Sequence, residues 1–257
     1  MVTAKVLIPM SDYGHDPTET AIPYTAFKEA GFEVSFATEN GKTPECDTKM
    51  LKGITQKLLG ATQPAIHAYN QMTTTPSFLH PLTWSSPTFT LDPYNLIFLP
   101  GGHDKSVSQL IDSPIMHKLL AAYFPATVKP SKKSVAAVCH GVMVLSETKL
   151  VDDDGGRRSV IHECMTTALP ARFEQAAFWG TRLFLGDHHK TYGAGSDDVE
   201  MSVRKCLDDP DKQYKNSLRM SPFVVEDQKY NYISARFPPE AQLLAEKTVA
   251  LVRSTLS

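Results

Sequence analysis

The stretch that most constrains the fold of this chain is residues 134–142, with the sequence SVAAVCHGV. Small and β-branched apolar residues fill its first part, which is typical of a buried strand. The apolar residues that begin at Gly141 indicate the start of a helix. Cys139 therefore lies at a sharp turn from a strand to a helix. Such a turn projects a side chain above the edge of a sheet, often with strained backbone angles.

The setting of Cys139 permits two interpretations. The start of a helix supplies free N–H groups and the positive end of the helix dipole, and both favour a thiolate over a thiol. Gly141 lets the chain turn tightly beside such a nucleophile. A free cysteine at the end of a strand can equally be a small buried hydrophobic residue. The local pattern leaves both interpretations open.

Length and composition favour one α/β domain, residues 1–257, with an insertion. Of the 257 residues, 42% are hydrophobic and 21% are charged, which is enough for a large core. The net charge of −2, without a basic stripe, argues against nucleic acid or an anionic membrane as partner. No apolar run has transmembrane length and no signal-peptide pattern is found. The four cysteines show no C-x-x-C spacing, so we expect free thiols in the cytoplasm.

Strand and helix patterns alternate along the chain, which predicts parallel strands joined by right-handed crossovers. Strands are expected over residues 3–9, 32–37, 95–99 and 134–138, with shorter ones at 158–161, 223–225 and 232–235. Helices are expected over 19–30, 106–124 with a break at Pro114, 170–185 and 238–256. A short amphipathic helix would contain Met50, Leu51, Ile54, Leu58 and Leu59.

Residues 43–92 interrupt this alternation. Their later part is rich in Pro, Ser and Thr, and the segment is unusually long for a connection inside a compact α/β domain. We interpret it as an insertion over one edge of the sheet. It is either a lid or a packed surface excursion without function.

Three turns lie at the carboxyl ends of the predicted strands, where the active sites of open parallel sheets gather. The first turn offers Glu19, the middle one offers the backbone of Gly101 and Gly102, and the third offers Cys139 with His140. Two glycines can bring N–H groups close to a ligand oxygen and form an oxyanion hole, but glycine pairs are also common in ordinary turns. His140 is either a base or a structural hydrogen-bonding residue.

Other motifs are weak. Residues 162–164 (HEC) and 187–189 (DHH) are dense in possible metal ligands, but neither has the spacing of a known zinc motif. The glycine pair belongs to no dinucleotide fingerprint and to no phosphate-binding loop. We therefore expect no metal and no cofactor. The elbow AVCHG has sulfur where the serine hydrolases have the G-x-S-x-G motif.

Taken together, these motifs resemble the ThiJ/PfpI family of the class I glutamine-amidotransferase-like superfamily. The resemblance covers nearly the whole chain. It rests on ETAIPY at 19–24, FEVSFATENG at 32–41, LPGGH at 99–103 and AVCHG at 137–141. It implies a flavodoxin-like parallel sheet sandwiched by helices, with an inserted cap segment, in a homodimer.

The resemblance also implies roles for individual residues. Cys139 matches the nucleophile at the elbow, and Glu19 matches the acidic residue that contacts its sulfur. His140 matches the catalytic histidine of the heat-shock glyoxalase branch. In that branch a further acidic residue orients the histidine. Glu174 is the first candidate for this residue and Glu163 the second.

The function expected from this resemblance is that of a cofactor-independent, glyoxalase III-like lyase. Cys139 would add to methylglyoxal or glyoxal as a hemithioacetal, and His140 or Glu19 would move the proton between the two carbons. Gly101 and Gly102 would stabilise the oxyanion, and a 2-hydroxy acid would leave. One alternative is an isocyanide hydratase or an enzyme of specialised metabolism that uses the same thiolate. The other is a non-catalytic, redox-sensing stress protein or holdase.

Overall fold

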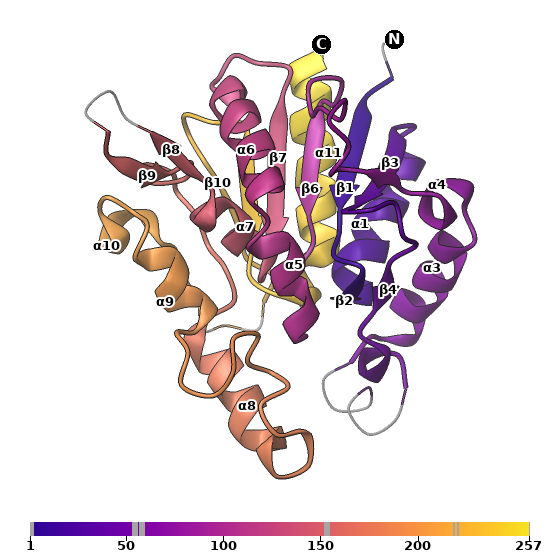
Figure 1. Cartoon of the computed structure of the whole chain (residues 1–257), viewed down its shortest axis with the longest axis vertical. Coiled ribbons are helices and arrows are strands. Elements are labelled where there is room, and N and C mark those ends of the chain that lie inside the picture. The colour runs from indigo at the N-terminus through magenta and orange to yellow at the C-terminus, as the bar shows by residue number, and fades with distance from the viewer. Residues whose placement is uncertain are drawn as a thin grey trace.

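The computed structural model describes residues 3–52, 56, 60–151, 155–217, 219 and 221–256. A mostly parallel sheet of seven strands forms its centre (Figure 1). In spatial order the strands are β10 (Val224–Glu226), β11 (Tyr232–Ala235), β7 (Ser134–Val138), β6 (Leu96–Leu99), β1 (Lys5–Pro9), β3 (Glu33–Thr38) and β5 (Leu82–Thr83). Every neighbouring pair is parallel except β10 with β11.

Helices cover both faces of the sheet, which gives the predicted three layers (Figure 1). On one face α1 (Pro17–Glu29) packs against α3 (Gln63–Thr73) and α11 (Ala241–Leu256). On the other face α7 (Gly141–Glu147) packs against α5 (Ser108–Ile111) and α6 (Pro114–Tyr123).

The central strands are buried on both sides because helices cover both faces of the sheet. Successive residues of a strand point to opposite faces and therefore join different cores. Leu7 and Ile97 belong to the apolar core beneath α5, α6 and α7. Ile8 and Phe98 belong to the core beneath α1 and α11. This explains why the strands are continuous apolar runs in the sequence rather than alternating ones.

The remaining elements lie around this sandwich. The strands β2 (Tyr13–His15) and β4 (Glu45–Cys46) pair with each other, as do β8 (Lys149–Val151) and β9 (Arg157–Ser159). The other helices are α4 (Pro76–Leu79), α8 (Ala171–Leu185), α9 (Val199–Arg204) and α10 (Pro210–Gln213). Short 3-10 helices are η1 (Thr48–Met50), η2 (Lys105–Val107), η3 (Phe124–Thr127) and η4 (Pro238–Glu240).

The predicted order of the main strands and helices is confirmed, and two of the predicted elements differ in detail. The long helix expected after β6 is divided into η2, α5, α6 and η3. Residues 158–161 contain only the end of β9, because the chain turns from Val160 onward. The two late strands expected at 223–225 and 232–235 are present as β10 and β11, which pair with each other in antiparallel direction.

The segment 43–92 takes part in the sheet as well as lying beside it. Its strand β5 extends the edge next to β3, and its helix α3 packs against α1. Of the short amphipathic helix expected there, Ile54, Leu58 and Leu59 lie outside the described residues, and Met50 ends η1.

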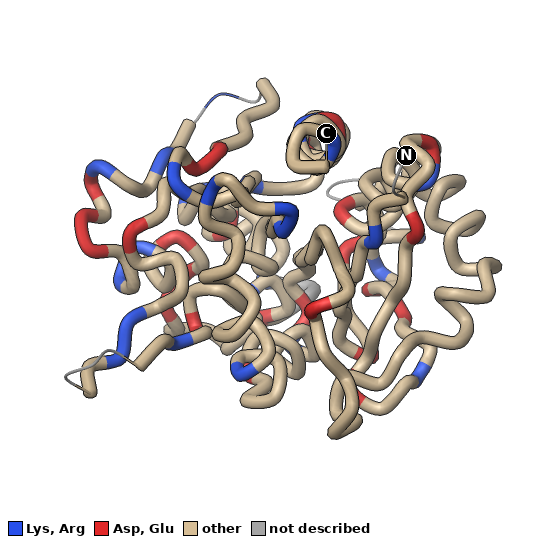
Figure 2. The backbone as a smooth tube through the Cα atoms, turned by 90° about the horizontal axis from the view of Figure 1, so that it is seen from above, with Lys and Arg blue, Asp and Glu red and all other residues tan. Residues whose placement is uncertain are grey.

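Two expectations from the sequence concern the distribution of charge and the presence of a membrane-spanning helix. Lys and Arg are interspersed with Asp and Glu around the backbone, without a band of one sign (Figure 2). In the part of the chain that the structure describes, no helix is long and apolar enough to cross a membrane.

The junction between β6 and α7 generates a test of the fold. A Cβ atom at Gly141 would lie 2.2 Å from the Leu99 carbonyl oxygen, so the helix can approach the strand only with glycine there. We expect Gly141→Ala to lower the free energy of unfolding by about 1–3 kcal/mol. The control is Gly180→Ala in α8, where a Cβ meets nothing within 4 Å. This second change should raise the free energy of unfolding by about 0.5–1 kcal/mol. Equal melting temperatures for both variants would contradict the packing.

Candidate active site

Cys139 lies at the elbow that the sequence predicts. Its backbone φ is 57°, and it is the one non-glycine residue with positive φ in the described part of the chain. The Cys139 N–H donates to the Ala235 carbonyl at 3.1 Å, and its own carbonyl accepts from the Val142 N–H at 3.3 Å. Cys139 thus makes the last hydrogen bond between β7 and β11 with its N–H, and its carbonyl makes the first hydrogen bond of the turn into α7. A left-handed conformation at a residue other than glycine costs about 1–3 kcal/mol, and such strain is concentrated at functional sites.

Glu19 is held against this elbow by the start of α1. The Asp16 carboxylate caps the helix by accepting from the N–H groups of Thr18 at 2.7 Å and Glu19 at 3.0 Å. The Glu19 side chain is fully buried, and its Oε2 accepts from the Gly101 N–H at 3.0 Å. A short helix cap therefore fixes the direction of the carboxyl group.

The backbone of Gly101 lies between the carboxyl of Glu19 and the side chain of Cys139, with no side chain of its own to keep them apart. A Cβ atom at this position would lie 2.6 Å from Glu19 Oε2 and 2.7 Å from Cys139 Cβ. Any side chain here would push the carboxyl and the cysteine apart. The glycine is required for this close approach, a role that was not predicted from the sequence.

Burial controls the protonation of Glu19. Loss of solvent raises the pKa of its carboxyl well above the ordinary range, and the nearby Asp16 carboxylate raises it further. Both effects favour the neutral carboxylic acid over the carboxylate. The buried Oε1 of Glu19 has no hydrogen-bond partner among the described residues, and a protonated carboxyl there can donate to the sulfur of Cys139.

The thiol of Cys139 experiences opposing effects. Burial raises the pKa of the thiol, and a charged Glu19 would raise it further. A hydrogen bond from the backbone N–H of His140 acts to lower it. The helix start alone therefore does not produce an acidic thiol, contrary to the expectation from the sequence. Protonation of Glu19 removes the negative charge beside the sulfur and replaces it with a hydrogen-bond donor. Ionisation of Cys139 thus depends on the proton of Glu19.

His140 points toward the sulfur. Its Nδ1 lies 3.4 Å from Cys139 Sγ, and the side chain is buried. Burial lowers the pKa of His140 to about 3, and the charges of His103, Lys190 and His189 act in the same direction. The ring is thus neutral at pH 7, and its Nδ1 is placed to accept a hydrogen bond from the thiol.

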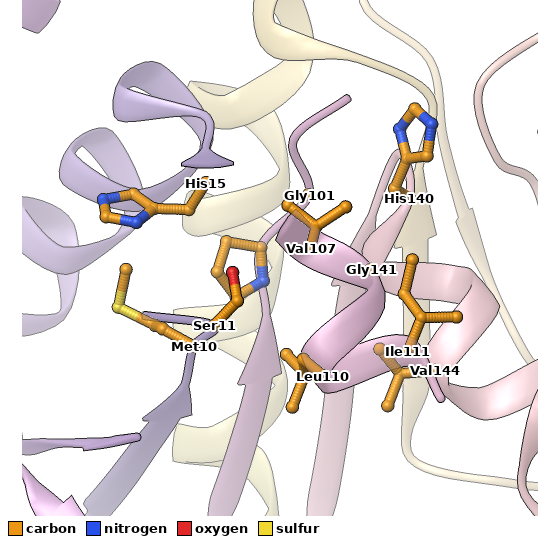
Figure 3. Close-up of a pocket in the computed structure, with 11 residues that line it drawn as sticks. Met10, Ser11, His15, Gly101, Val107, Leu110, Ile111, His140, Gly141 and Val144 are labelled. Atoms are coloured by element: carbon orange, nitrogen blue, oxygen red, sulfur yellow. The ribbon is translucent and has the colours of Figure 1, made fainter. Parts of the chain in front are cut away.

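A small cavity borders the elbow on the side of α5 and α7 (Figure 3). Its volume is about 10 Å³, close to the minimum for one water molecule. Pro100, Gly101, His140 and Gly141 form the end of the cavity nearest the cysteine. It is too small for a substrate and lies on the core side of the turn.

Two of the predicted roles need correction. The Gly101 N–H is already bonded to Glu19, so it is not free for an oxyanion. The Gly102 N–H donates no hydrogen bond to any described residue and stays a candidate.

The second correction concerns the acidic partner of His140. Glu174 bonds Lys190 Nζ at 3.0 Å and the Val199 N–H at 2.8 Å. Glu163 bonds Lys229 Nζ at 2.6 Å and also Tyr230. Neither carboxylate contacts His140 in the described contacts. Glu174 instead holds Lys190, whose charge affects the histidine.

Several polar residues near the site were not predicted from the sequence. His103 directly follows the glycine pair, and His189 and Lys190 come from the loop after α8. All three lie close enough to lower the pKa of His140. The position of His103 at the end of a strand is one signal in the sequence. His189 belongs to the 187–189 motif, but nothing in the sequence places that motif or Lys190 beside His140.

The buried histidines lead to a prediction on stability against pH. The pKa values of His15, His140 and His189 are each lowered from 6.5 to about 3. As the pH falls from 6.5 towards 3, the unfolded chain binds protons that the folded protein does not, so the free energy of unfolding decreases.

His15 offers the simplest test, because its Nε2 lies 3.1 Å from the Tyr69 hydroxyl and burial is the only cause of its shift. Between pH 6.5 and 5, we expect wild type to lose about 1.5 kcal/mol more than His15→Gln in urea unfolding. The exposed His67→Gln serves as the control. The same loss in wild type and in His15→Gln would show that His15 is charged when folded.

Known proteins resemble this chain in sequence and in fold. The family described as ThiJ/PfpI family-like matches residues 10–217. An uncharacterised protein of Schizosaccharomyces pombe is 28% identical over 255 residues, which cover 99% of this chain and 86% of that protein.

Two further proteins with this likeness carry functional names. A glutathione-independent glyoxalase of S. pombe is 30% identical over 149 residues, covering 58% of this chain and 57% of that protein. The crystal structure of glyoxalase III from Candida albicans superposes with a TM-score of 0.61 at 16% identity. That match covers 96% of this chain and 97% of the other.

Proposed function

Since the chain belongs to the ThiJ/PfpI-like family, we propose that it is a cofactor-independent cysteine enzyme that converts methylglyoxal or glyoxal to a 2-hydroxy acid. One observation carries the proposal. The strained Cys139 lies between the buried carboxyl of Glu19, whose pKa is raised by burial, and the neutral imidazole of His140. The glyoxalases named among the similar proteins support the choice of substrate class.

The first step in this mechanism is formation of the nucleophile. His140 Nδ1 accepts the thiol proton across 3.4 Å, and the hydrogen bond from Glu19 stabilises the thiolate. The sulfur then adds to the aldehyde carbon, and the aldehyde oxygen takes the thiol proton back from His140, which completes the hemithioacetal and leaves the imidazole neutral for the next step. The free Gly102 N–H supports the negative oxygen as it forms.

The second step moves hydrogen between the two carbons. His140 removes the proton from the carbon bonded to sulfur, which gives an enediol, and a proton returns to the neighbouring carbon. The product is a thioester of the 2-hydroxy acid. Water cleaves it, releases the acid and restores the thiol. The carbon that was the aldehyde is oxidised and its neighbour is reduced, so no external oxidant is needed.

Three expectations from the sequence stay predictions at this stage. They are the homodimer, the cytoplasmic location and a lid function for residues 43–92. Two short strands of that segment, β4 and β5, pair with β2 and β3, so part of it is structural. If the segment acts as a lid, the residues of 43–92 outside β4 and β5 would form it.

Replacement of Cys139 tests the nucleophile. We expect Cys139→Ala to lower turnover of methylglyoxal, without added thiol, by at least about a thousandfold. Cys206→Ala is the matched control, because that cysteine is also partly buried and lies away from the elbow. It should keep wild-type turnover.

Chemical labelling gives a second measurement of the same claim. One equivalent of iodoacetamide at mildly acidic pH should label Cys139 before Cys46, Cys164 or Cys206. Burial raises the thiol pKa of the other three as well, but they lack a neutral acid beside the sulfur. A first label elsewhere, or full activity in Cys139→Ala, would falsify the mechanism. Oxidation of Cys139 to a sulfinate in a protein without turnover would favour the redox sensor.

Replacement of Glu19 tests the source of thiolate stabilisation. Gln at position 19 can accept from the Gly101 N–H and still donate to sulfur, whereas Ala can do neither. We expect the alkylation rate of Cys139 at pH 7 to fall about tenfold or more in Glu19→Ala and less in Glu19→Gln. The exposed Glu29→Ala on the same helix is the control. Equal rates in all four proteins would remove Glu19 from the site.

A further inference from the structure

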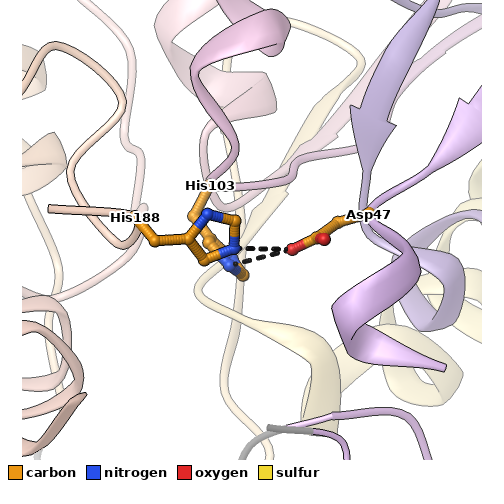
Figure 4. A group of neighbouring side chains, drawn as sticks. All are labelled: Asp47, His103 and His188. Atoms are coloured by element: carbon orange, nitrogen blue, oxygen red, sulfur yellow. Dashed lines mark hydrogen bonds and ion pairs between the residues drawn. The ribbon is translucent and has the colours of Figure 1, made fainter. Parts of the chain in front are cut away.

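Asp47, His103 and His188 bring their polar atoms together beside the cysteine site (Figure 4). We propose that these three residues bind a divalent transition-metal ion of the zinc type. The site is separate from the thiol chemistry described above and uses none of the residues assigned to it.

The distances suit such an ion. Asp47 Oδ2 lies 2.9 Å from His188 Nε2 and 3.4 Å from His103 Nε2. All three ligand atoms lie within 4.8 Å of one another. Around a tetrahedral zinc ion with bonds of about 2.0–2.2 Å, ligand atoms stand about 3.3 Å apart. The ion therefore needs only small movements of the two rings.

The type of ligand fits as well. Two imidazole nitrogens and one carboxylate oxygen form the set found in open zinc sites and in the facial triads of iron proteins. Three ligands leave a position for water or for another group. His189 is a candidate for it, because its ring centroid lies 4.4 Å from that of His103 and its buried Nε2 has no hydrogen-bond partner.

The hydrogen bonding of the cluster is incomplete without an ion. Both imidazoles approach the same oxygen of Asp47, and only His188 makes a hydrogen bond to it. His103 Nε2 is buried at 3.4 Å from that oxygen, where it forms an ion pair if protonated but no hydrogen bond. A metal ion would bond to all three atoms at once. It would also neutralise the carboxylate of Asp47, which is 1% exposed.

The groups around His188 determine how tightly an ion is held. A histidine that binds metal through Nε2 donates its Nδ1–H, typically to a carboxylate, and Asp104 Oδ2 lies 3.8 Å from that nitrogen. Lys49 Nζ lies 3.1 Å from the same nitrogen and opposes this arrangement with its positive charge. Removal of the Lys49 charge should therefore strengthen metal binding, which a merely structural histidine pair does not predict.

The three ligands come from distant parts of the chain. Asp47 follows β4 in the segment 43–92, His103 follows β6, and His188 lies in the loop after α8. A bound ion would therefore cross-link three segments that meet at the carboxyl end of the sheet. We expect it to raise the melting temperature of the protein.

The test is metal binding by the full chain after treatment with a chelator and dialysis. Isothermal titration with Zn²⁺ should show one equivalent per chain, and Co²⁺ should give the visible absorption of a four-coordinate site. His188→Gln should weaken binding about 100-fold or more, and Lys49→Met should tighten it about tenfold. His162→Gln is the control, because it removes a similar histidine paired with Asp208 at 2.8 Å.

Cys139→Ala separates this proposal from the function of the cysteine. Its affinity for Zn²⁺ should equal that of wild type if the three residues are the ligands. Loss of the equivalent in Cys139→Ala would place the metal on the thiol and overturn the assignment. No binding by wild type, or equal binding by His188→Gln and wild type, would show that the cluster is only a hydrogen-bonded group.

Discussion

The contact between Glu19 and Cys139 across Gly101 is the constraint on which the site depends. A carboxyl fully withdrawn from water is costly as an anion, and the cost is avoided when the group keeps its proton. That proton turns an acidic side chain into a hydrogen-bond donor for sulfur. The same burial that makes Glu19 useful would make Cys139 a poor nucleophile if the acid were charged. The two groups therefore work as a pair.

The sheet provides this pairing through its topology. The strands β1, β6 and β7 are parallel neighbours, so the turns that follow them meet at one edge. A hydrogen bond of 2.9 Å from the Asp16 N–H to the Gly101 carbonyl joins the first turn to the second. The approach of Gly141 to Leu99 joins the second to the third. Rigid strands position the three groups, and the strain at Cys139 is tolerated because the surrounding core is packed on both faces.

Much of this arrangement could be predicted from local sequence. The apolar run before Cys139 and the glycines on either side of it in space each have a signature within a few residues. The family resemblance supplied Glu19. Partners of polar groups could not be predicted, because they depend on distances between segments far apart in the chain. For this reason Glu174 was assigned to His140, although its carboxylate bonds Lys190. The motif at 187–189 is dense in possible metal ligands, but the meeting of His188 with Asp47 and His103 could not be predicted for the same reason.

The most direct test of the account is the protonation state of Glu19 at neutral pH. Infrared difference spectra of wild type against Glu19→Gln isolate the carboxyl band of this residue from those of other buried acids. The account predicts a protonated carboxyl band at pH 7 that is absent from the variant and that shifts on alkylation of Cys139. A carboxylate band at pH 7, unchanged when Cys139 is alkylated, would contradict it.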